Sequence, residues 1–241
     1  MKTPKLKTEY IDLRDITIAY CKYGTGPALI FLHGNSETKT IFNKFQLEFG
    51  ESYTTYAPDS RGHGQSGKNE NKYTILQFAD DVIEFCRAMK IKECMVVGYS
   101  DGGNIALCLA VKAPDIFKRL VAISPNYLAS GSKKWFLRLI GGIKRTAQFL
   151  SRLGFKTKQT IMLVDLMLED IGLSDEDLRQ IKAELLIAYA PKDMIYEEHF
   201  KQTADLVPGC KLVKIPKCNH LTIMRREKLR EVIWEFLGKK E

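Results

Sequence analysis

The segment Gly98-Tyr99-Ser100-Asp101-Gly102-Gly103 decides how this sequence is interpreted. It follows an apolar run at residues 94–97 that is typical of a buried strand, and it precedes residues 104–110, which have a helical pattern. A strand, a sharp turn with glycines on both sides of a serine, and a helix together predict a nucleophile elbow. The glycines remove Cβ atoms that would collide in such a turn. Ser100 would then lie at a helix N-terminus, where backbone amides favour negative charge.

The composition indicates an ordinary globular chain. Its 241 residues suffice for one domain with a sizeable core, or for one domain that carries an insertion. Hydrophobic residues make up 45% of the chain and charged residues 27%, which excludes a disordered protein. No uncharged apolar run reaches about 18 residues, so no transmembrane helix is predicted. The basic N-terminus lacks an apolar stretch, and we therefore expect no secretion through a signal peptide.

The net charge and the cysteines bear on partners and location. The formal charge is +8, but no nucleic-acid-binding motif occurs, so a solvated basic surface explains it more simply and no nucleic-acid partner is expected. The cysteines have neither C-x-x-C spacing nor the density of a disulfide scaffold, which predicts reduced thiols and a cytoplasmic protein. They are Cys21, Cys86, Cys94, Cys108, Cys210 and Cys218.

Apolar runs typical of strands alternate with helical segments. The predicted strands are residues 10–13, 16–23, 28–32, 53–58, 94–99, 120–124, 184–190 and 211–215. Most of them lack polar alternation, which indicates a parallel sheet buried on both faces after an antiparallel start. Helices are predicted over residues 74–89, opened by a capping box of Thr74 and Gln77, and over residues 221–237. The expected fold class is α/β, with a mostly parallel eight-stranded sheet and helices on both faces.

One long segment interrupts this alternation. About 60 residues separate the strands ending near residue 124 and starting near residue 184, which is too long for a structureless loop. Helical patterns cover residues 133–149, 160–171 and 174–183 instead. We therefore expect a helical cap or lid, residues 126–183, inserted into a core formed by residues 1–125 and 184–241.

The predicted cap has an unusual charge. Residues 133–158 carry eight lysines and arginines and no acidic residue. One interpretation is a cap whose apolar face lines an acyl pocket and whose cations attract an anionic substrate or a lipid surface. The other is an amphipathic helix that packs its apolar side and exposes its basic side to water. Under the first interpretation Tyr99, Trp135 and Phe136 are the candidate pocket residues.

A serine hydroxyl becomes a nucleophile when a base takes its proton and a third group orients that base. His220 is the candidate base, because it follows the strand at residues 211–215 at the sheet edge where parallel strands collect ligands. Asp193 is the candidate acid, because it follows the strand at residues 184–190, one α/β unit earlier. Its alternative role is a surface turn. Asp101 lies nearer to Ser100 in the sequence, but it is expected to cap the helix that follows.

The oxyanion of an acyl-transfer reaction requires two fixed N–H donors. One is the amide of Asp101, the residue after the nucleophile. The other is expected from the loop after the strand at residues 28–32, through the amide of Asn35, with Gly34 allowing close approach of the backbone. His33 in the same loop is expected to be structural.

These motifs resemble the α/β-hydrolase superfamily, in particular its small members with a helical cap. The matching segments occur in the family's order and span most of the chain: His33-Gly34, residues 59–66, residues 98–103, Asp193 with Met194-Ile195, and Asn219-His220. The resemblance implies catalytic roles for Ser100, Asp193 and His220, and oxyanion roles for the backbone of Asn35 and Asp101. It implies no metal or organic cofactor. A serine nucleophile argues against the dehalogenase and epoxide hydrolase branches, which use a carboxylate.

The expected function is a carboxylesterase-like serine hydrolase that acts on a small to medium acyl substrate through an acyl-enzyme. Two alternatives remain open at this point. The same triad serves carbon–carbon bond hydrolysis, lyase, acyltransferase or perhydrolase chemistry, and the same fold serves non-catalytic receptors. The expected partner is a small molecule, with an anionic one as an open alternative. No stable insertion into a membrane is expected, and no oligomeric state is predicted.

Overall fold

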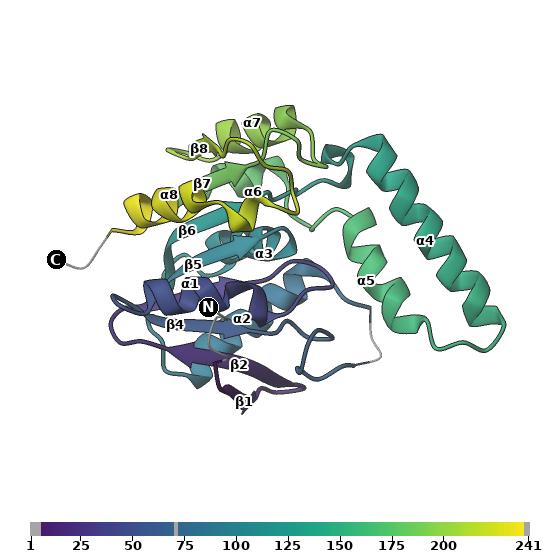
Figure 1. Cartoon of the computed structure of the whole chain (residues 1–241), viewed down its shortest axis with the longest axis horizontal. Helices are drawn as coiled ribbons and strands as arrows, with labels where there is room; N and C mark the ends of the chain where they lie inside the picture. The colour runs from purple at the N-terminus through teal and green to yellow at the C-terminus, as the bar shows by residue number, and fades with distance from the viewer. Residues whose placement is uncertain (1–5, 70–71, 239–241) are drawn as a thin grey trace.

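Within residues 6–69 and 72–238, which the computed structural model describes, eight strands form one sheet in the order β1-β2-β4-β3-β5-β6-β7-β8 (Figure 1). The strands are β1 (Thr8–Asp12), β2 (Thr17–Tyr23), β3 (Ala28–Leu32), β4 (Thr54–Pro58), β5 (Cys94–Tyr99), β6 (Phe117–Ile123), β7 (Glu184–Tyr189) and β8 (Lys211–Lys214). The first two strands pair antiparallel, and β2 pairs antiparallel with β4. From β4 to β8 all neighbours are parallel, so the predicted mostly parallel sheet is confirmed.

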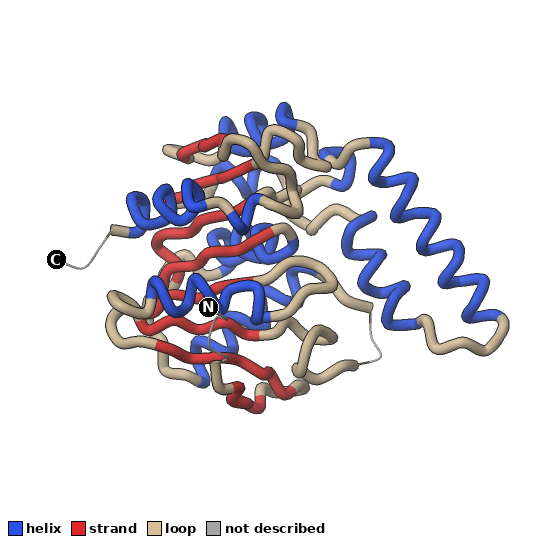
Figure 2. Tube along the Cα trace, viewed as in Figure 1, coloured by secondary structure: helices blue, strands red, loops and turns tan. Residues whose placement is uncertain are grey.

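Helices cover both faces of this sheet (Figure 2). On one face, α1 (Asn43–Phe49) and α8 (Glu227–Leu237) bury Phe45, Phe49 and Ile233 against the strands. The opposite face is covered by four helices, whose apolar side chains belong to a second core cluster. They are α2 (Ile75–Ala88), α3 (Asp101–Lys112), α6 (Asp175–Arg179) and α7 (Glu197–Leu206). Both faces of the central strands are therefore shielded from water, as their uninterrupted apolar sequences require.

Helix boundaries follow local capping signals. The side chain of Thr74 accepts a hydrogen bond from the Gln77 amide at 3.1 Å and begins α2 at the predicted position. Ser174 and Asp177 form a complete capping box that begins α6. Helix α1 was not predicted. Its seven residues place Phe45 and Phe49 on the core side, together with Phe42 of the preceding 3₁₀ turn, a spacing that could have identified it.

Two helices stand apart from the sheet. Helices α4 (Lys134–Arg152) and α5 (Lys158–Leu168) lie side by side at one end of the molecule in Figure 1 and contact each other, and the buried residues of α4 are Ile140 and Ala147. We name this pair the α4–α5 hairpin. Within the predicted cap, residues 126–183, helix α6 instead packs with α3 and α7, and its Leu178 is fully buried in the core. The α4–α5 hairpin is therefore shorter than residues 126–183, the segment that we expected to form the cap.

None of the helices between residues 6 and 238, with residues 70–71 set aside, combines the length and the apolar character needed to cross a membrane.

Candidate active site

The site is organised around Ser100, at the point where β5 ends and α3 begins. Ser100 has φ 54° and ψ −117°, a region that a residue with a side chain rarely adopts. Its amide is held by the carbonyl of Ile123 at 2.8 Å. A Cβ atom on Gly98 would lie 2.0 Å from the carbonyl oxygen of Gly102, and a Cβ on Gly102 would lie 2.0 Å from that of Leu32. The turn therefore requires glycine at both positions.

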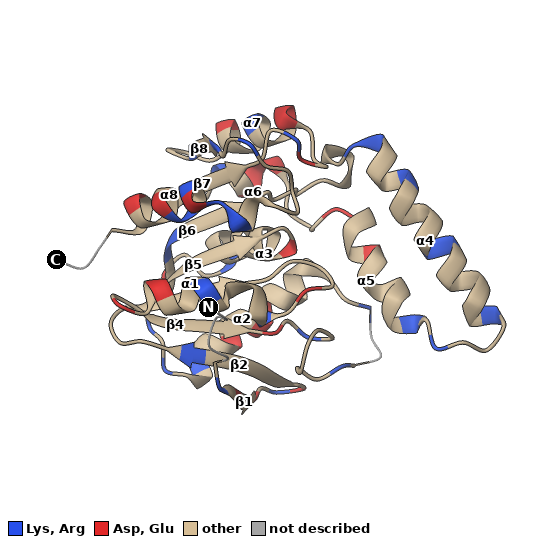
Figure 3. Ribbon diagram, in the orientation of Figure 1, with Lys and Arg blue, Asp and Glu red and all other residues tan. Residues whose placement is uncertain are grey.

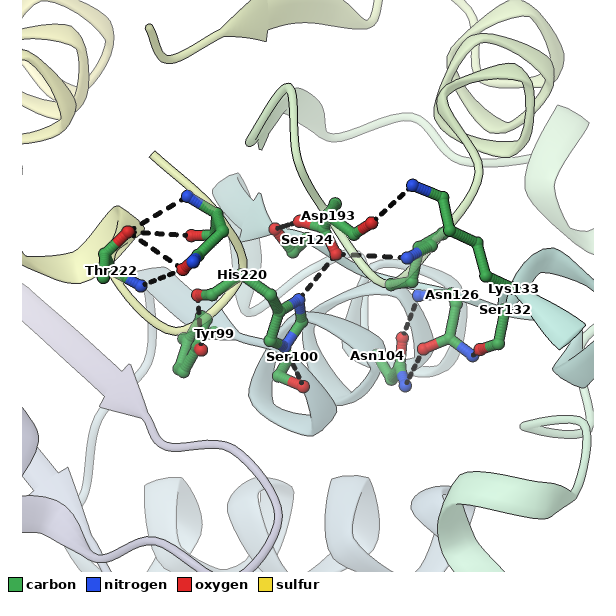
Figure 4. Close-up of polar contacts among 12 residues, drawn as sticks. Tyr99, Ser100, Asn104, Ser124, Asn126, Ser132, Lys133, Asp193, His220 and Thr222 are labelled. Carbon is green, nitrogen blue, oxygen red and sulfur yellow. Dashed lines mark hydrogen bonds and ion pairs between the residues drawn. The ribbon is translucent and has the colours of Figure 1, made fainter. Parts of the chain in front are cut away.

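His220 lies between Ser100 and Asp193, as Figure 4 shows. The Nε2 atom of His220 is 3.1 Å from Ser100 Oγ, and its Nδ1 atom is 2.7 Å from Asp193 Oδ1. His220 is in the loop after β8, and its carbonyl accepts a hydrogen bond from the Tyr99 hydroxyl at 2.8 Å. The structure thus brings together the three side chains that the sequence assigned to the triad, although Ser100 and His220 are 120 residues apart along the chain.

The carboxylate of Asp193 is buried but well satisfied. Its Oδ2 atom accepts a hydrogen bond from Ser124 Oγ at 2.7 Å, and its Oδ1 atom accepts the amide of Ile195 at 3.2 Å. Burial alone would raise the pKa of Asp193, but the hydrogen bonds from His220, Ser124 and Ile195 and the nearby imidazole hold that pKa below its usual value. Asp193 therefore remains ionised beside His220, and it fixes the imidazole with Nδ1 as the donor.

Ser124 was not singled out in the sequence, although it follows β6 directly. The rule that ligand-binding groups gather at the carboxyl ends of parallel strands would have identified it. Lys133 was also missed: its Nζ atom donates to the carbonyl of Asp193 at 2.7 Å and ties the start of α4 to the acid loop. No sequence pattern marks that contact.

Asn35 and Asp101 both line the cavity beside Ser100. Neither backbone amide donates to a protein acceptor within the described ranges 6–69 and 72–238, so both can donate to a bound oxygen. The Asn35 side chain is engaged separately: its Nδ2 atom donates to Asp101 Oδ2 at 2.9 Å and to the carbonyl of Leu163 in α5 at 2.8 Å. Asn35 thereby joins the loop after β3, the elbow and the α4–α5 hairpin.

Asp101 differs from its expected role as a helix cap. The N-cap residue is Ser100, and Asp101 is the first residue of α3. Its carboxylate is buried against Asn35, and burial raises the pKa of Asp101 to about 6, although the hydrogen bond from Asn35 acts in the opposite direction.

A cavity of about 280 Å³ opens beside Ser100 and His220. Tyr99 and Phe136 line it, as expected, together with Met167, Met194 and Leu221. Trp135 is not among the lining residues, and 56% of its surface is exposed, so its predicted place in the pocket is wrong. Consecutive helical residues point about 100° apart, and on α4 this turns Phe136 to the cavity and Trp135 to the exposed surface.

Glu37 also lines this cavity and was missed by the sequence reasoning. Its Oε2 atom accepts the amide of Gly34 at 3.1 Å, and burial raises the pKa of its carboxyl group. The residues that line the cavity thus include the acidic Glu37 and Asp101, whereas no lysine or arginine of the described chain lines it.

His33 and His63, which precede the elbow in the sequence, make no hydrogen bond with the series of Ser100, His220 and Asp193. The buried ring of His33 accepts the amide of Ser60 at Nε2, 3.0 Å away, and its Nδ1 atom lies 2.8 Å from the carbonyl of Gly34. Burial lowers the pKa of His33 to about 4, so the ring is neutral. His63 packs against it with 5.2 Å between ring centroids. Across the described residues, no cluster of three or more histidine, cysteine, aspartate or glutamate side chains is arranged to hold a metal ion.

A serine at an elbow, an imidazole, a buried carboxylate and two free amides define a hydrolase-type site on a parallel sheet. The chain belongs to the α/β-hydrolase fold family, since the model of that family matches residues 27–176. It is 33% identical over 113 residues to a 2-(acetamidomethylene)succinate hydrolase of Mesorhizobium japonicum, a match that covers 47% of this chain and 41% of that protein. The chain thus matches less than half the length of this relative.

Solved structures with the same fold cover nearly the whole chain. An α/β hydrolase from a deep-sea metagenome library superposes with a TM-score of 0.84 at 19% identity, over 97% of this chain and 98% of the other. A carboxylesterase of Bacillus subtilis superposes with a TM-score of 0.79 at 19% identity, over 97% and 92% of the two chains. At these identities the similarity establishes the fold.

Proposed function

We propose that this protein is a serine hydrolase that cleaves a carboxylic ester of a small to medium substrate through an acyl-enzyme. The observation that carries the proposal is the continuous hydrogen-bonded series Ser100–His220–Asp193 beside two unpaired amides. A nucleophile, a base, an orienting acid and oxyanion donors are together sufficient for acyl transfer.

In the first half of the reaction, Ser100 Oγ attacks the ester carbonyl carbon and its proton passes to His220 Nε2. The carbonyl π electrons move to the oxygen, which accepts hydrogen bonds from the amides of Asn35 and Asp101. Asp193 stabilises the imidazolium. When the intermediate collapses, the bond to the leaving oxygen breaks and His220 returns its proton to that oxygen, which releases the alcohol.

In the second half, water attacks the acyl group on Ser100 and gives a proton to His220. The new tetrahedral intermediate breaks the bond to Ser100 Oγ, which regains its proton, and the carboxylic acid product leaves. The nucleophile of the first half, the base, the acid and the oxyanion donors of this sequence of steps all come from the chain itself.

The chemistry of the cavity wall supports a neutral substrate. Glu37 and Asp101 would repel an anionic acyl group, and the cations of the α4–α5 hairpin do not line the cavity. We therefore propose a neutral ester, in preference to the anionic alternative that the basic sequence had left open. The volume of about 280 Å³ suits a short to medium acyl chain.

A fluorophosphonate probe tests the nucleophile directly. We expect it to label the wild-type protein and to leave Ser100→Ala unlabelled, with circular dichroism showing both folded. A folded wild type that resists the probe would contradict the enzyme proposal and favour a non-catalytic receptor.

The bond that is cleaved requires a second test. p-Nitrophenyl esters of increasing chain length, assayed beside thioesters and lactones, should show the highest kcat/KM for neutral esters of short to medium length. Labelling by the probe without turnover of any ester would reject the ester specificity, and would direct attention to carbon–carbon cleavage or acyl transfer by the same triad.

A further inference from the structure

The α4–α5 hairpin exposes an apolar surface that the rest of the protein does not cover. Six large hydrophobic side chains in residues 135–155 have between 41% and 61% of their surface exposed. They are Trp135, Leu139, Ile143, Phe149, Leu153 and Phe155, and we name them the apolar stripe. Elsewhere in the described chain the exposed large hydrophobic residues are three tyrosines and Leu221, which borders the cavity.

Helical geometry gathers the stripe on one side of α4. At about 100° per residue, Trp135, Leu139, Ile143, Phe149 and Leu153 fall within an arc of roughly 120°. The adjoining arc that packs on α5 carries the buried Ile140 and Ala147. The stripe is therefore a second apolar face, in addition to the face that the hairpin uses for its own packing.

Cations border the stripe. By the same angular count, Lys134, Arg138, Arg145 and Arg152 occupy an arc of roughly 40° directly beside it. Figure 3 shows Lys and Arg along α4 and no Asp or Glu on that helix. No ion pair joins these four side chains to an acid among residues 6–69 and 72–238, whereas Lys144, on the other side, pairs with Asp165 at 2.6 Å.

An apolar face of this kind, bordered by unpaired cations, matches an anionic lipid surface. The apolar side chains enter the boundary between headgroups and acyl chains, and the cations pair with anionic headgroups at the same depth. A second copy of this chain fits less well, because a symmetric pair would bring the same cations together without any acid on α4 to neutralise them.

We propose that the apolar stripe and its bordering cations dock this protein on the surface of an anionic phospholipid bilayer. The docking helix also carries Phe136, which lines the cavity, so the bilayer contact and the cavity lie on adjoining sides of α4. The proposal concerns binding, and its test does not depend on the proposed hydrolase activity.

Co-sedimentation with vesicles provides that test. Full-length protein should pellet with phosphatidylcholine vesicles that contain phosphatidylglycerol, pellet weakly with phosphatidylcholine alone, and be released by salt. Trp135 should report the contact as a blue shift in tryptophan emission, which Trp135→Phe would lose while still binding. The second tryptophan, Trp234, stacks on Phe49 at 4.1 Å and should contribute little.

Paired variants separate the two components of binding. Phe149→Ser/Leu153→Ser should weaken binding to the mixed vesicles roughly tenfold or more, because apolar area is lost. Arg145→Gln/Arg152→Gln should weaken it roughly thirtyfold at low salt and reduce the salt dependence by about half, because two of the four bordering cations remain. All four side chains are exposed, so circular dichroism should show intact folds.

Matched control variants change exposed residues outside the α4–α5 hairpin. Tyr10→Ser removes an aromatic side chain that is 57% exposed, and Lys92→Gln/Lys182→Gln removes two exposed charges. Both should bind like wild type. Equal binding to both vesicle types, or variants of the stripe that bind like the controls, would overturn the proposal. So would a dimer in sedimentation velocity that Phe149→Ser/Leu153→Ser dissolves, or binding to polyglutamate without binding to vesicles.

Discussion

At the scale of single residues, Asp193 shows how a carboxylate can be buried and still stay ionised. Its carboxylate is buried away from water, yet hydrogen-bond donors from Ser124 after β6, from the loop after β7 and from His220 replace the lost hydration. A buried carboxylate satisfied in this way fixes the tautomer of its histidine as well as the orientation of the ring.

Asp193→Asn should therefore reduce kcat on a p-nitrophenyl ester by a factor on the order of 10³ to 10⁴ while leaving the fold intact. The amide cannot accept from every present donor, and it favours the tautomer with the proton on Nε2, which then cannot take the proton of Ser100. Asp205→Asn, on the exposed side of α7, is the matched control and should retain wild-type turnover. Comparable kcat values for both variants would place the acid elsewhere.

The glycines of the elbow and of the α4–α5 hairpin should respond in opposite ways to the same substitution. Gly98→Ala places a methyl group against a backbone oxygen, and it should lower the free energy of unfolding by more than about 4 kcal/mol. Gly141→Ala meets nothing within 4 Å in a helix interior, and it should raise that free energy by about 0.5 to 1 kcal/mol. Urea unfolding measures both, and a tolerated Gly98→Ala would show that the turn is less constrained than its geometry indicates.

Asp101 should make stability depend on pH. Its pKa is about 6 in the folded protein against a usual 3.8, so the folded state binds more protons than the unfolded state between those values. The free energy of unfolding therefore includes a contribution from Asp101 that is complete at low pH. This contribution decreases as the pH rises from 3.8 through 6, by about 3 kcal/mol in all. Asp101→Asn should unfold at increasingly higher urea concentration than wild type as the pH rises from 4 to 7. A difference that does not change with pH would contradict this account.

At the scale of elements, the hairpin is tied to the core by few polar contacts, and Asn35 makes one of them. Asn35→Ala keeps the backbone amide at the cavity but loses the hydrogen bond to Leu163. We expect faster hydrogen exchange across α5 and unchanged exchange in α2. Thr40→Ala, which removes an exposed hydrogen bond to Thr38 in the segment that follows, is the control. If both variants exchange alike, Asn35 does not hold the hairpin.

Much of this arrangement follows from sequence patterns, because parallel strands bring their carboxyl ends to one edge. The elbow motif indicated Ser100, that rule indicated Asp193 and His220 as its neighbours, and the rule extends to Ser124. The rotation of α4 about its own axis could not be predicted from the sequence. Trp135 and Phe136 were both expected at the cavity, and of these two only Phe136 lines it. Glu37 was missed because its place in the wall depends on the path of a loop, which no periodicity describes. The catalytic roles themselves stay predictions until they are tested.

At the scale of the whole molecule, six thiols share one chain without a disulfide, and five of them are buried. Cys86 and Cys94 lie 4.0 Å apart at sulfur, within the core cluster on the α2 and α3 side. Burial raises the pKa of Cys108 and of the partly exposed Cys210 to about 12, so thiolate is scarce at neutral pH even where reagents have access.

A thiol reagent should therefore distinguish native from unfolded protein. In the native state we expect at most about one slow equivalent to react with a disulfide reagent at neutral pH, from Cys210, and all six equivalents to react in denaturant. Cys210→Ser should remove the native reaction. Several fast equivalents in the native protein would show that its core opens readily.

Glu37 has a consequence for the end of the proposed reaction cycle. An ester substrate enters uncharged, but the acid that forms on deacylation ionises at neutral pH and then faces carboxyl groups of the same wall. Like charge at short range favours its departure. Carboxylate products should consequently be weak inhibitors, whereas the alcohol product carries no such penalty, and the asymmetry should favour turnover in the direction of hydrolysis.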